Sequence, residues 1–192
     1  MLRLAFLLVL AASPALAGAP APLAADEAAV VGGWSSGQAR YVTRVALFPI
    51  AESGGCLRIV PDGKIVTLED HVTADKGPLW KVHRLKPGRY ALGAVYWDAR
   101  VSGYLTTSWY GYAIQRGRLF TFDVAAGQVT NIGVWPVTSP YAQHYETGAP
   151  DLAAAADRAK TLAEGVGPLV AAQVTQAEVV WAKDPCPAKA GG

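Results

Sequence analysis

The sequence contains few of the residues from which catalytic and metal sites are usually built. It has only two cysteines, three histidines and one methionine in 192 residues, and charged residues make up 17% of the chain. The histidines His71, His83 and His144 are isolated and match neither H-x-H nor H-E-x-x-H. The alternating Asp residues of a calcium loop are also missing. We therefore expect no metal site, no cofactor and no enzymatic activity.

The sequence also lacks a charge imbalance and a long apolar segment. Its 17 Lys and Arg residues nearly balance 15 Asp and Glu residues, which leaves a formal net charge of +2. A nucleic-acid-binding face normally needs clustered positive charge, so we expect no nucleic acid partner. Beyond the N-terminus, no segment approaches the roughly 20 continuous apolar residues of a transmembrane helix. We expect a chain that does not span a membrane.

The first residues, MLRLAFLLVLAASPALAGAP, have the pattern of a secretory signal peptide. Arg3 precedes an apolar run over residues 4–12, and the small residues Ala15 and Ala17 follow. This pattern predicts cleavage near Ala17, so that residues 1–17 are a signal peptide and the mature protein is periplasmic or secreted. The remaining chain fits one domain on the usual range of about 100–200 residues.

Cys56 and Cys186 are the only two cysteines. Because an exported protein meets an oxidising compartment, we expect them to form a disulfide that ties the C-terminal tail to an early strand. The alternative is two unpaired thiols.

After the signal peptide, the chain divides into three parts that differ in composition and in the periodicity of their apolar residues. Residues 18–38 are rich in Ala and Pro, lack periodicity and predict a flexible N-terminal segment. Residues 39–138 contain short apolar runs separated by Gly and Pro turns, a pattern typical of an antiparallel β-sandwich of about seven or eight strands. Residues 139–192 are predicted to form a C-terminal helical extension packed on the sandwich.

Within the β region, RYVTRVALFPI at residues 40–50 is apolar on both faces and predicts a central strand ended by Pro49. The turn residues 61–64, Pro-Asp-Gly-Lys, predict a hairpin between the runs on either side. Further on, we expect a strand near residues 79–82, a Pro87-Gly88 turn, and an internal strand over residues 89–97.

Later strands are expected to flank a turn at residues 125–128. Phe120, Phe122 and Val124 alternate with Thr121 and Asp123, which predicts a strand with one solvated face.

After Pro150 the pattern changes to helical spacing. Residues 151–166 predict one amphipathic helix with Asp151 near its start and glycines at its end. Residues 169–182 fit either a second helix or a closing strand.

The motif Leu85-x-Pro87-Gly88-x-Tyr90-x-Leu92, followed by a Gly-containing turn between apolar runs over residues 122–133, resembles a family pattern. It is similar to exported bacterial β-sandwich proteins with transthyretin-like or carboxypeptidase-regulatory-like domains, many in uncharacterised families. The resemblance covers roughly residues 80–135. It implies a sandwich and an envelope setting, and it transfers no catalytic residue.

GWSSG, at residues 33–37, matches the G-x-S-x-G pattern of a nucleophilic serine. Its context differs, because no buried strand is expected before it and no helix after it. A flexible turn is the favoured interpretation, and a small secreted serine hydrolase that uses Ser35 or Ser36 with a histidine is the alternative.

Aromatic residues are concentrated around the segment WDARVSGYLTTSWYGY. They fit either the core of a sandwich or an exposed platform for a sugar or a protein partner. We predict that the chain is a non-catalytic envelope module that binds a protein or glycan there, and a purely structural envelope component is a further alternative. The candidate binding residues are Trp97, Asp98, Arg100, Tyr104, Trp109, Tyr110 and Tyr112.

Overall fold

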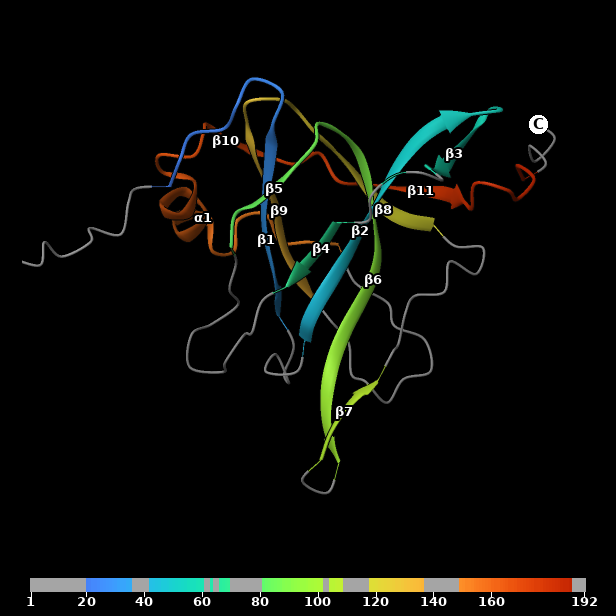
Figure 1. Ribbon diagram of the computed structural model, residues 1–192, viewed down its shortest axis with the longest axis horizontal. Helices are drawn as coiled ribbons and strands as arrows, with labels where there is room; N and C mark the ends of the chain where they lie inside the picture. Colours follow the sequence, from blue (N-terminus) through green and yellow to red (C-terminus); the bar gives the residue numbers. More distant parts are fainter. Residues whose placement is uncertain are drawn as a thin grey trace, which may run out of the picture.

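The computed structural model describes residues 20–35, 42–60, 63, 66–69, 81–101, 104–108, 118–136 and 149–187. The fold is mainly β, with two sheets and one short helix (Figure 1). The strands are β1 (Ala28–Ser35), β2 (Val42–Ser53), β3 (Cys56–Ile59), β4 (Val66–Glu69), β5 (His83–Leu85), β6 (Gly88–Val101), β7 (Tyr104–Ser108), β8 (Arg118–Val124), β9 (Val129–Pro136), β10 (Leu169–Ala171) and β11 (Thr175–Val180), and the helix is α1 (Ala156–Ala163).

The smaller sheet has the strand order β10-β9-β1-β5. Strand β9 is parallel to both β1 and β10, whereas β5 is antiparallel to β1. Neighbouring parallel strands need a crossover connection, and α1 provides it between β9 and β10. The helix lies beside this sheet and buries Ala159 and Ala163, whose small side chains allow close packing (Figure 1).

The larger sheet closes on itself. Its strand order is β4-β2-β3-β11-β8-β6-β7, and β2 also pairs with β6. Strand β2 is long enough to pair with three strands. One of its edges pairs with β6, and the other pairs first with β4 and then with β3. The strands β2, β3, β11, β8 and β6 therefore form a closed ring, with β11 parallel to β3 and antiparallel to β8.

The alternation of side chains along the ring strands separates two apolar cores. On β6, Ala91 belongs to one core, whereas its neighbours Tyr90 and Leu92 belong to the other. The first core takes its residues from the five ring strands alone: Ala46, Phe48, Ile50, Ile59, Ala91, Leu119 and Val179. The second core joins the ring to the smaller sheet and α1, and its largest fully buried side chains include Trp135 and Phe122.

The chain passes from the smaller sheet to the ring at the corner between β5 and β6. Tyr90 is 4% exposed, and its hydroxyl donates a hydrogen bond to the carbonyl oxygen of Lys86 at 2.7 Å. Its ring stacks on Phe122 with centroids 6.5 Å apart. Burial raises the pKa of the Tyr90 phenol above its ordinary value. The LxPGxYxL motif therefore places a buried tyrosine that holds the turn before it.

Several strand predictions are confirmed, and others change. The internal strand expected over residues 89–97 is β6, and the residues near its start are buried on both faces. The central strand β2 does not end at Pro49, which pairs with Tyr90, but continues to Ser53. The hairpin expected around residues 61–64 is wrong, because the described residues of β3 and β4 both pair with β2.

The termini also depart from expectation. Residues 28–35, expected within a flexible segment, form β1 at the centre of the smaller sheet, where residues 28–31 are fully buried. Among the described residues of the C-terminal part, 149–187, the one helix is α1, which is shorter than expected. The choice left open for residues 169–182 is settled as strand, since β10 and β11 join different sheets.

On β8, Asp123 is exposed as expected, but Thr121 is fully buried. Its side chain lies on the same face of β8 as Leu119, a residue of the first core, and its hydroxyl lies 3.1 Å from that of Thr175 on the neighbouring strand β11.

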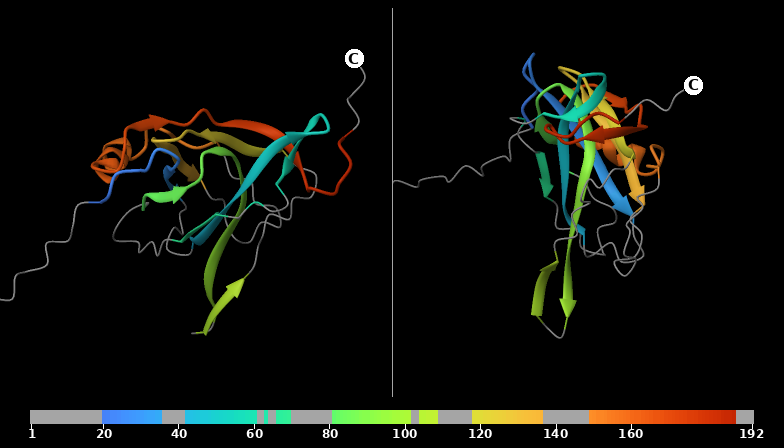
Figure 2. Two further views of the ribbon diagram at one scale, coloured as in Figure 1. Left: turned by 45° about the horizontal axis from the view of Figure 1, so that its top comes forward. Right: turned by 90° about the vertical axis from the view of Figure 1, so that its right-hand side faces the viewer.

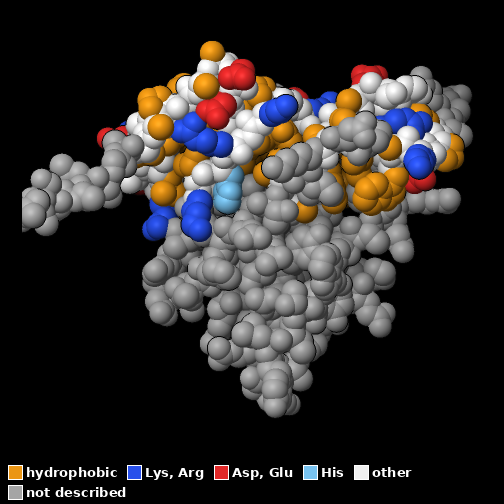
Figure 3. Space-filling model, viewed as in Figure 1, with side chains coloured by type: hydrophobic (Ala, Val, Ile, Leu, Met, Phe, Trp, Pro, Cys, Tyr) orange, Lys and Arg blue, Asp and Glu red, His pale blue; other side chains and the backbone are white. Residues whose placement is uncertain are grey.

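Among the described residues, no helix has the length and apolar character needed to cross a membrane. Positively and negatively charged side chains both occur across the described part of the face in Figure 3, with hydrophobic side chains between them.

Candidate functional site

The segment expected to bind a partner begins on a projecting ribbon. Strand β6 pairs with β2 as far as Trp97, where β7 also begins to pair with it. Beyond Trp97, the described residues of β6 pair only with β7. This two-stranded ribbon, which we call the arm and define as residues 98–101 and 104–108, extends away from the smaller sheet and from the other strands of the larger sheet (Figures 1 and 2).

The register locates four of the seven candidate binding residues on β6 and β7. Trp97 stands at the base of the arm opposite Ser108, Asp98 opposite Thr107, Arg100 opposite Leu105, and Tyr104 opposite Val101. Because a strand rises about 3.3 Å per residue, these positions fall within about 13 Å along the ribbon. Trp109, Tyr110 and Tyr112 lie outside the described residues.

The residues of the alternative hydrolase are not brought together where the structure describes them. Ser35 is the last residue of β1, and His83 on β5 pairs with Val30, five positions earlier along the same strand. At about 3.3 Å per residue, the Cα atoms of Ser35 and His83 are roughly 16 Å apart, too far for direct proton transfer between these two residues. Ser36, His71 and His144 lie outside the described residues.

Within the described ranges, no group of three or more His, Cys, Asp or Glu side chains is placed to hold a metal ion.

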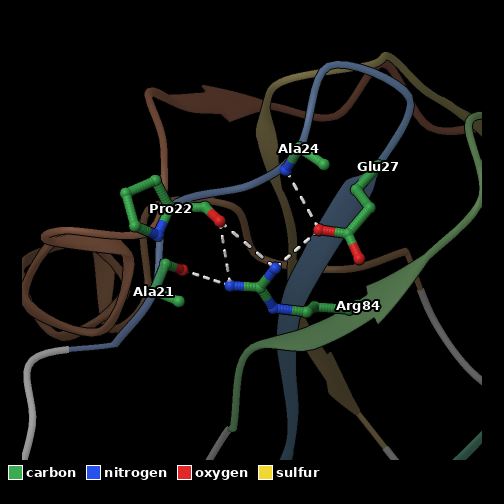
Figure 4. A network of polar contacts seen from close by, with 5 residues as sticks. All are labelled: Ala21, Pro22, Ala24, Glu27 and Arg84. Atoms are coloured by element: carbon green, nitrogen blue, oxygen red, sulfur yellow. Dashed lines mark hydrogen bonds and ion pairs between the residues drawn. The ribbon is translucent and has the colours of Figure 1, made fainter.

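Two arginines that the sequence analysis did not single out bind the described N-terminal and C-terminal segments through hydrogen bonds. The first is Arg84 on β5, which anchors the N-terminal segment (Figure 4). Its guanidinium pairs with Glu27 at 2.6 Å and donates hydrogen bonds to the carbonyl oxygens of Ala21 and Pro22. Glu27 also accepts a hydrogen bond from the amide of Ala24. That hydrogen bond, together with the Arg84 charge, lowers the pKa of Glu27 below its ordinary value.

The anchored N-terminal segment borders an open groove of about 780 Å³ next to α1. Pro22 and Leu169 line it together with residues 160, 161 and 163–167. Its charged lining residues, Lys160 and Glu164, have opposite signs, so the lining favours neither anions nor cations.

The second organising residue is Arg58 on β3, at the opposite end of the ring from the arm (Figure 1). Its guanidinium donates to the carbonyl oxygens of Ser53 at 3.1 Å and Ala182 at 3.2 Å, and also to those of Trp181 and Asp184. It therefore holds the segment after β11 against the turn between β2 and β3.

The expected disulfide lies in this same region and joins Cys56 to Cys186 across 130 positions of sequence. Nη2 of Arg58 lies 3.2 Å from Sγ of Cys186. Beside it, Trp181 is 42% exposed and packs edge-on against Phe48 with ring centroids 5.9 Å apart.

A signal for Arg58 exists in the sequence, since it is a lone charge between apolar residues two positions after a cysteine. Nothing local indicates its partners in residues 181–186, because these are distant in sequence. Arg84 is hidden in the same way, since its partners lie in a segment that was expected to be flexible.

No protein-family model, curated protein or solved structure matches this chain. The arm, the two arginines and the disulfide are therefore interpreted from their own geometry.

Proposed function

We propose that this protein is an exported, non-catalytic binding module with a β-sandwich architecture, and that it docks a protein partner through the arm. The observation that carries the proposal is the pairing of the arm: beyond Trp97 the described residues of β6 pair only with β7, and both extend past the other described strands. Export is supported by the signal-peptide pattern and by the disulfide.

A two-stranded ribbon is at best marginally stable in water without further packing. Among the described pairings, the arm has no third strand, and β7 stands at the end of the sheet order. The sequence of β7, YLTTS, contains neither a charge nor a proline, the residues with which proteins commonly block an exposed edge. An extended segment of another protein that added to this edge would satisfy its backbone groups.

The residue types on and beside the arm also favour a protein over a glycan. Arg100, Tyr104 and Trp97 are of the types that dominate binding energy in protein interfaces. A glycan could stack on the aromatic rings, but it would offer no regular row of backbone partners to β7.

The test places a photoreactive amino acid at Thr106 on β7 and, as a matched control, at Ala171 on β10, an exposed end strand of the other sheet. Each variant is expressed in cells and irradiated. We expect a discrete protein adduct from position 106 only, and its loss when Thr107→Lys adds a charge to the edge. Equal labelling from both positions, or none from position 106, would contradict the proposal.

A second measurement separates the two partner classes. The purified protein is titrated with a panel of cell-envelope glycans while tryptophan fluorescence is recorded. A saturable change that is abolished by Trp97→Ala in a folded variant would identify a glycan and overturn the protein-docking proposal.

A further inference from the structure

The Cys56–Cys186 disulfide lies near the protein surface, a position that a purely structural crosslink does not need. Both cysteines are half-buried rather than enclosed in the core. Cys56 is the first residue of β3, and Cys186 lies in the segment after β11, so the bond is near the surface at one end of the ring.

The positive charge beside this bond is placed asymmetrically. Nη2 of Arg58 lies 3.2 Å from Sγ of Cys186, and the described sulfur contacts of this guanidinium involve Cys186 alone. The guanidinium is held in position by hydrogen bonds to four backbone carbonyl groups, one before β3 and three after β11.

This charge is not neutralised by a carboxylate among the described residues. The ion pairs found there join Arg84 to Glu27 and Arg89 to Asp123, whereas Arg58 contacts Asp184 only through its backbone oxygen. When the disulfide opens, a thiolate on Cys186 would be the natural counter-ion of the guanidinium. An adjacent arginine favours the thiolate form of cysteine and makes that sulfur the better leaving group.

We propose that Cys56–Cys186 is a directional thiol–disulfide exchange site for dithiols, in which Cys56 is the sulfur attacked and Cys186 is the sulfur released. The attacking thiolate forms a new bond to Sγ of Cys56, the S–S bond breaks, and its electron pair goes to Sγ of Cys186. The resulting thiolate pairs with Arg58.

The second thiol of the dithiol loses its proton to solvent and attacks its own sulfur bonded to Cys56. The thiolate of Cys56 leaves and takes up a proton, and the dithiol becomes a disulfide. The protein gains the two electrons that the dithiol loses. Because the thiolate of Cys186 and Arg58 remain paired, the C-terminal segment stays against β3, and the same exchange in reverse, with the disulfide of the oxidised dithiol as electron acceptor, re-forms the bond.

The first experiment uses the unmodified, folded protein. It is exposed briefly to dilute dithiothreitol or 2-mercaptoethanol, quenched with acid, alkylated, and mapped by mass spectrometry. We expect the mixed disulfide with 2-mercaptoethanol on Cys56 and the alkyl label on Cys186. An adduct found mainly on Cys186, or equally on both cysteines, would overturn the assignment of direction.

The second experiment measures the role of Arg58 by the initial rate of reduction with dithiothreitol at neutral pH. Since a nearby opposite charge shifts thiol ionisation substantially, Arg58→Gln should slow reduction about tenfold. Arg58→Lys should retain part of the rate. Arg84→Gln is the matched control, because it also removes an arginine that binds backbone carbonyls, and its rate should equal that of the unmodified protein.

Circular dichroism establishes that each variant is folded before its rate is compared. Reduction of the unmodified protein only in denaturant, or an unchanged rate in folded Arg58→Gln, would show that the disulfide is a structural crosslink and not an exchange site.

Discussion

Gly133 on β9 is a position where a single added methyl group should be strongly destabilising, because backbone strain and steric overlap act there together. Its φ is +79°, a left-handed backbone that costs a residue with a side chain about 1–2 kcal/mol. A Cβ atom there would lie 2.9 Å from Cβ of Pro150, 3.0 Å from Cδ2 of Leu152 and 3.1 Å from the carbonyl oxygen of Asp151.

These neighbours cannot move aside easily. Asp151 and Val134 exchange two backbone hydrogen bonds, of 2.8 and 2.9 Å, which fix the segment after Pro150 against β9. Overpacking of this kind typically adds about 1–3 kcal/mol to the conformational cost. We expect Gly133→Ala to lower the free energy of unfolding by about 2–5 kcal/mol in total.

Gly127, in the turn between β8 and β9, is the matched control. Its φ is +70°, but an added Cβ would meet nothing within 4 Å. Gly127→Ala should therefore cost only the conformational part, about 1–2 kcal/mol. Urea unfolding of the two variants separates steric overlap from backbone strain.

Leu152→Ala in the Gly133→Ala background removes one of the clashing atoms. The two substitutions should therefore be less damaging together than the sum of their separate effects, by roughly 0.5–2 kcal/mol. Equal losses in Gly133→Ala and Gly127→Ala, or strict additivity with Leu152→Ala, would refute the steric explanation.

Three other substitutions test the corner, the N-terminal anchor and the disulfide. Tyr90→Phe removes the hydrogen bond to the exposed Lys86 and should cost about 1 kcal/mol in urea unfolding. Because burial raises the folded-state pKa of Tyr90, stability should fall as pH rises above 10, and this fall should be smaller in Tyr90→Phe. The folded-state pKa of Glu27 is lowered, so its contribution is present above its unfolded value of 4.5 and is lost as pH falls through the folded value. Unfolding midpoints of the unmodified protein and Glu27→Gln should therefore converge in acid; a constant gap would contradict this. Cys186→Ser opens a loop of 130 positions and should cost up to about 5 kcal/mol in the chain-entropy model, and no loss would show that the bond does not constrain the unfolded chain.

Local patterns in the sequence predict the individual strands well where both faces carry the signal. Apolar residues on both sides of β2 and β6 indicate internal strands, because each face packs against a different core. The Pro87-Gly88 and Gly127 turns can be predicted equally well from the sequence, since few residues suit those backbone conformations. The predicted binding site is harder to derive from the sequence. Its described residues are Trp97, Asp98, Arg100 and Tyr104, and their relative positions depend on a strand register that no local pattern specifies.

Errors occurred where a distant segment changed the environment of a residue. Thr121 looked solvated on its own strand, but closure of the ring places it on the same face of β8 as Leu119 of the first core, where it is buried. Residues 28–35 lie in a segment without periodicity and so looked flexible, but they pair with β9 on one side and β5 on the other. Two β strands flanking residues 61–64 looked like a hairpin, but each pairs with β2, whose length allows both contacts along one edge.

The sequence by itself indicated the mainly β character, the turns at Pro87-Gly88 and Gly127 and the pairing of the two cysteines, because these follow from short-range alternation, backbone preference and residue count. The tertiary structure alone decided the closure of β2, β3, β11, β8 and β6 into a ring, the insertion of β1 into the smaller sheet, and the approach of Arg58 to Cys186. Each of these joins residues far apart in the chain. Such contacts depend on the fold as a whole, and no local pattern records them.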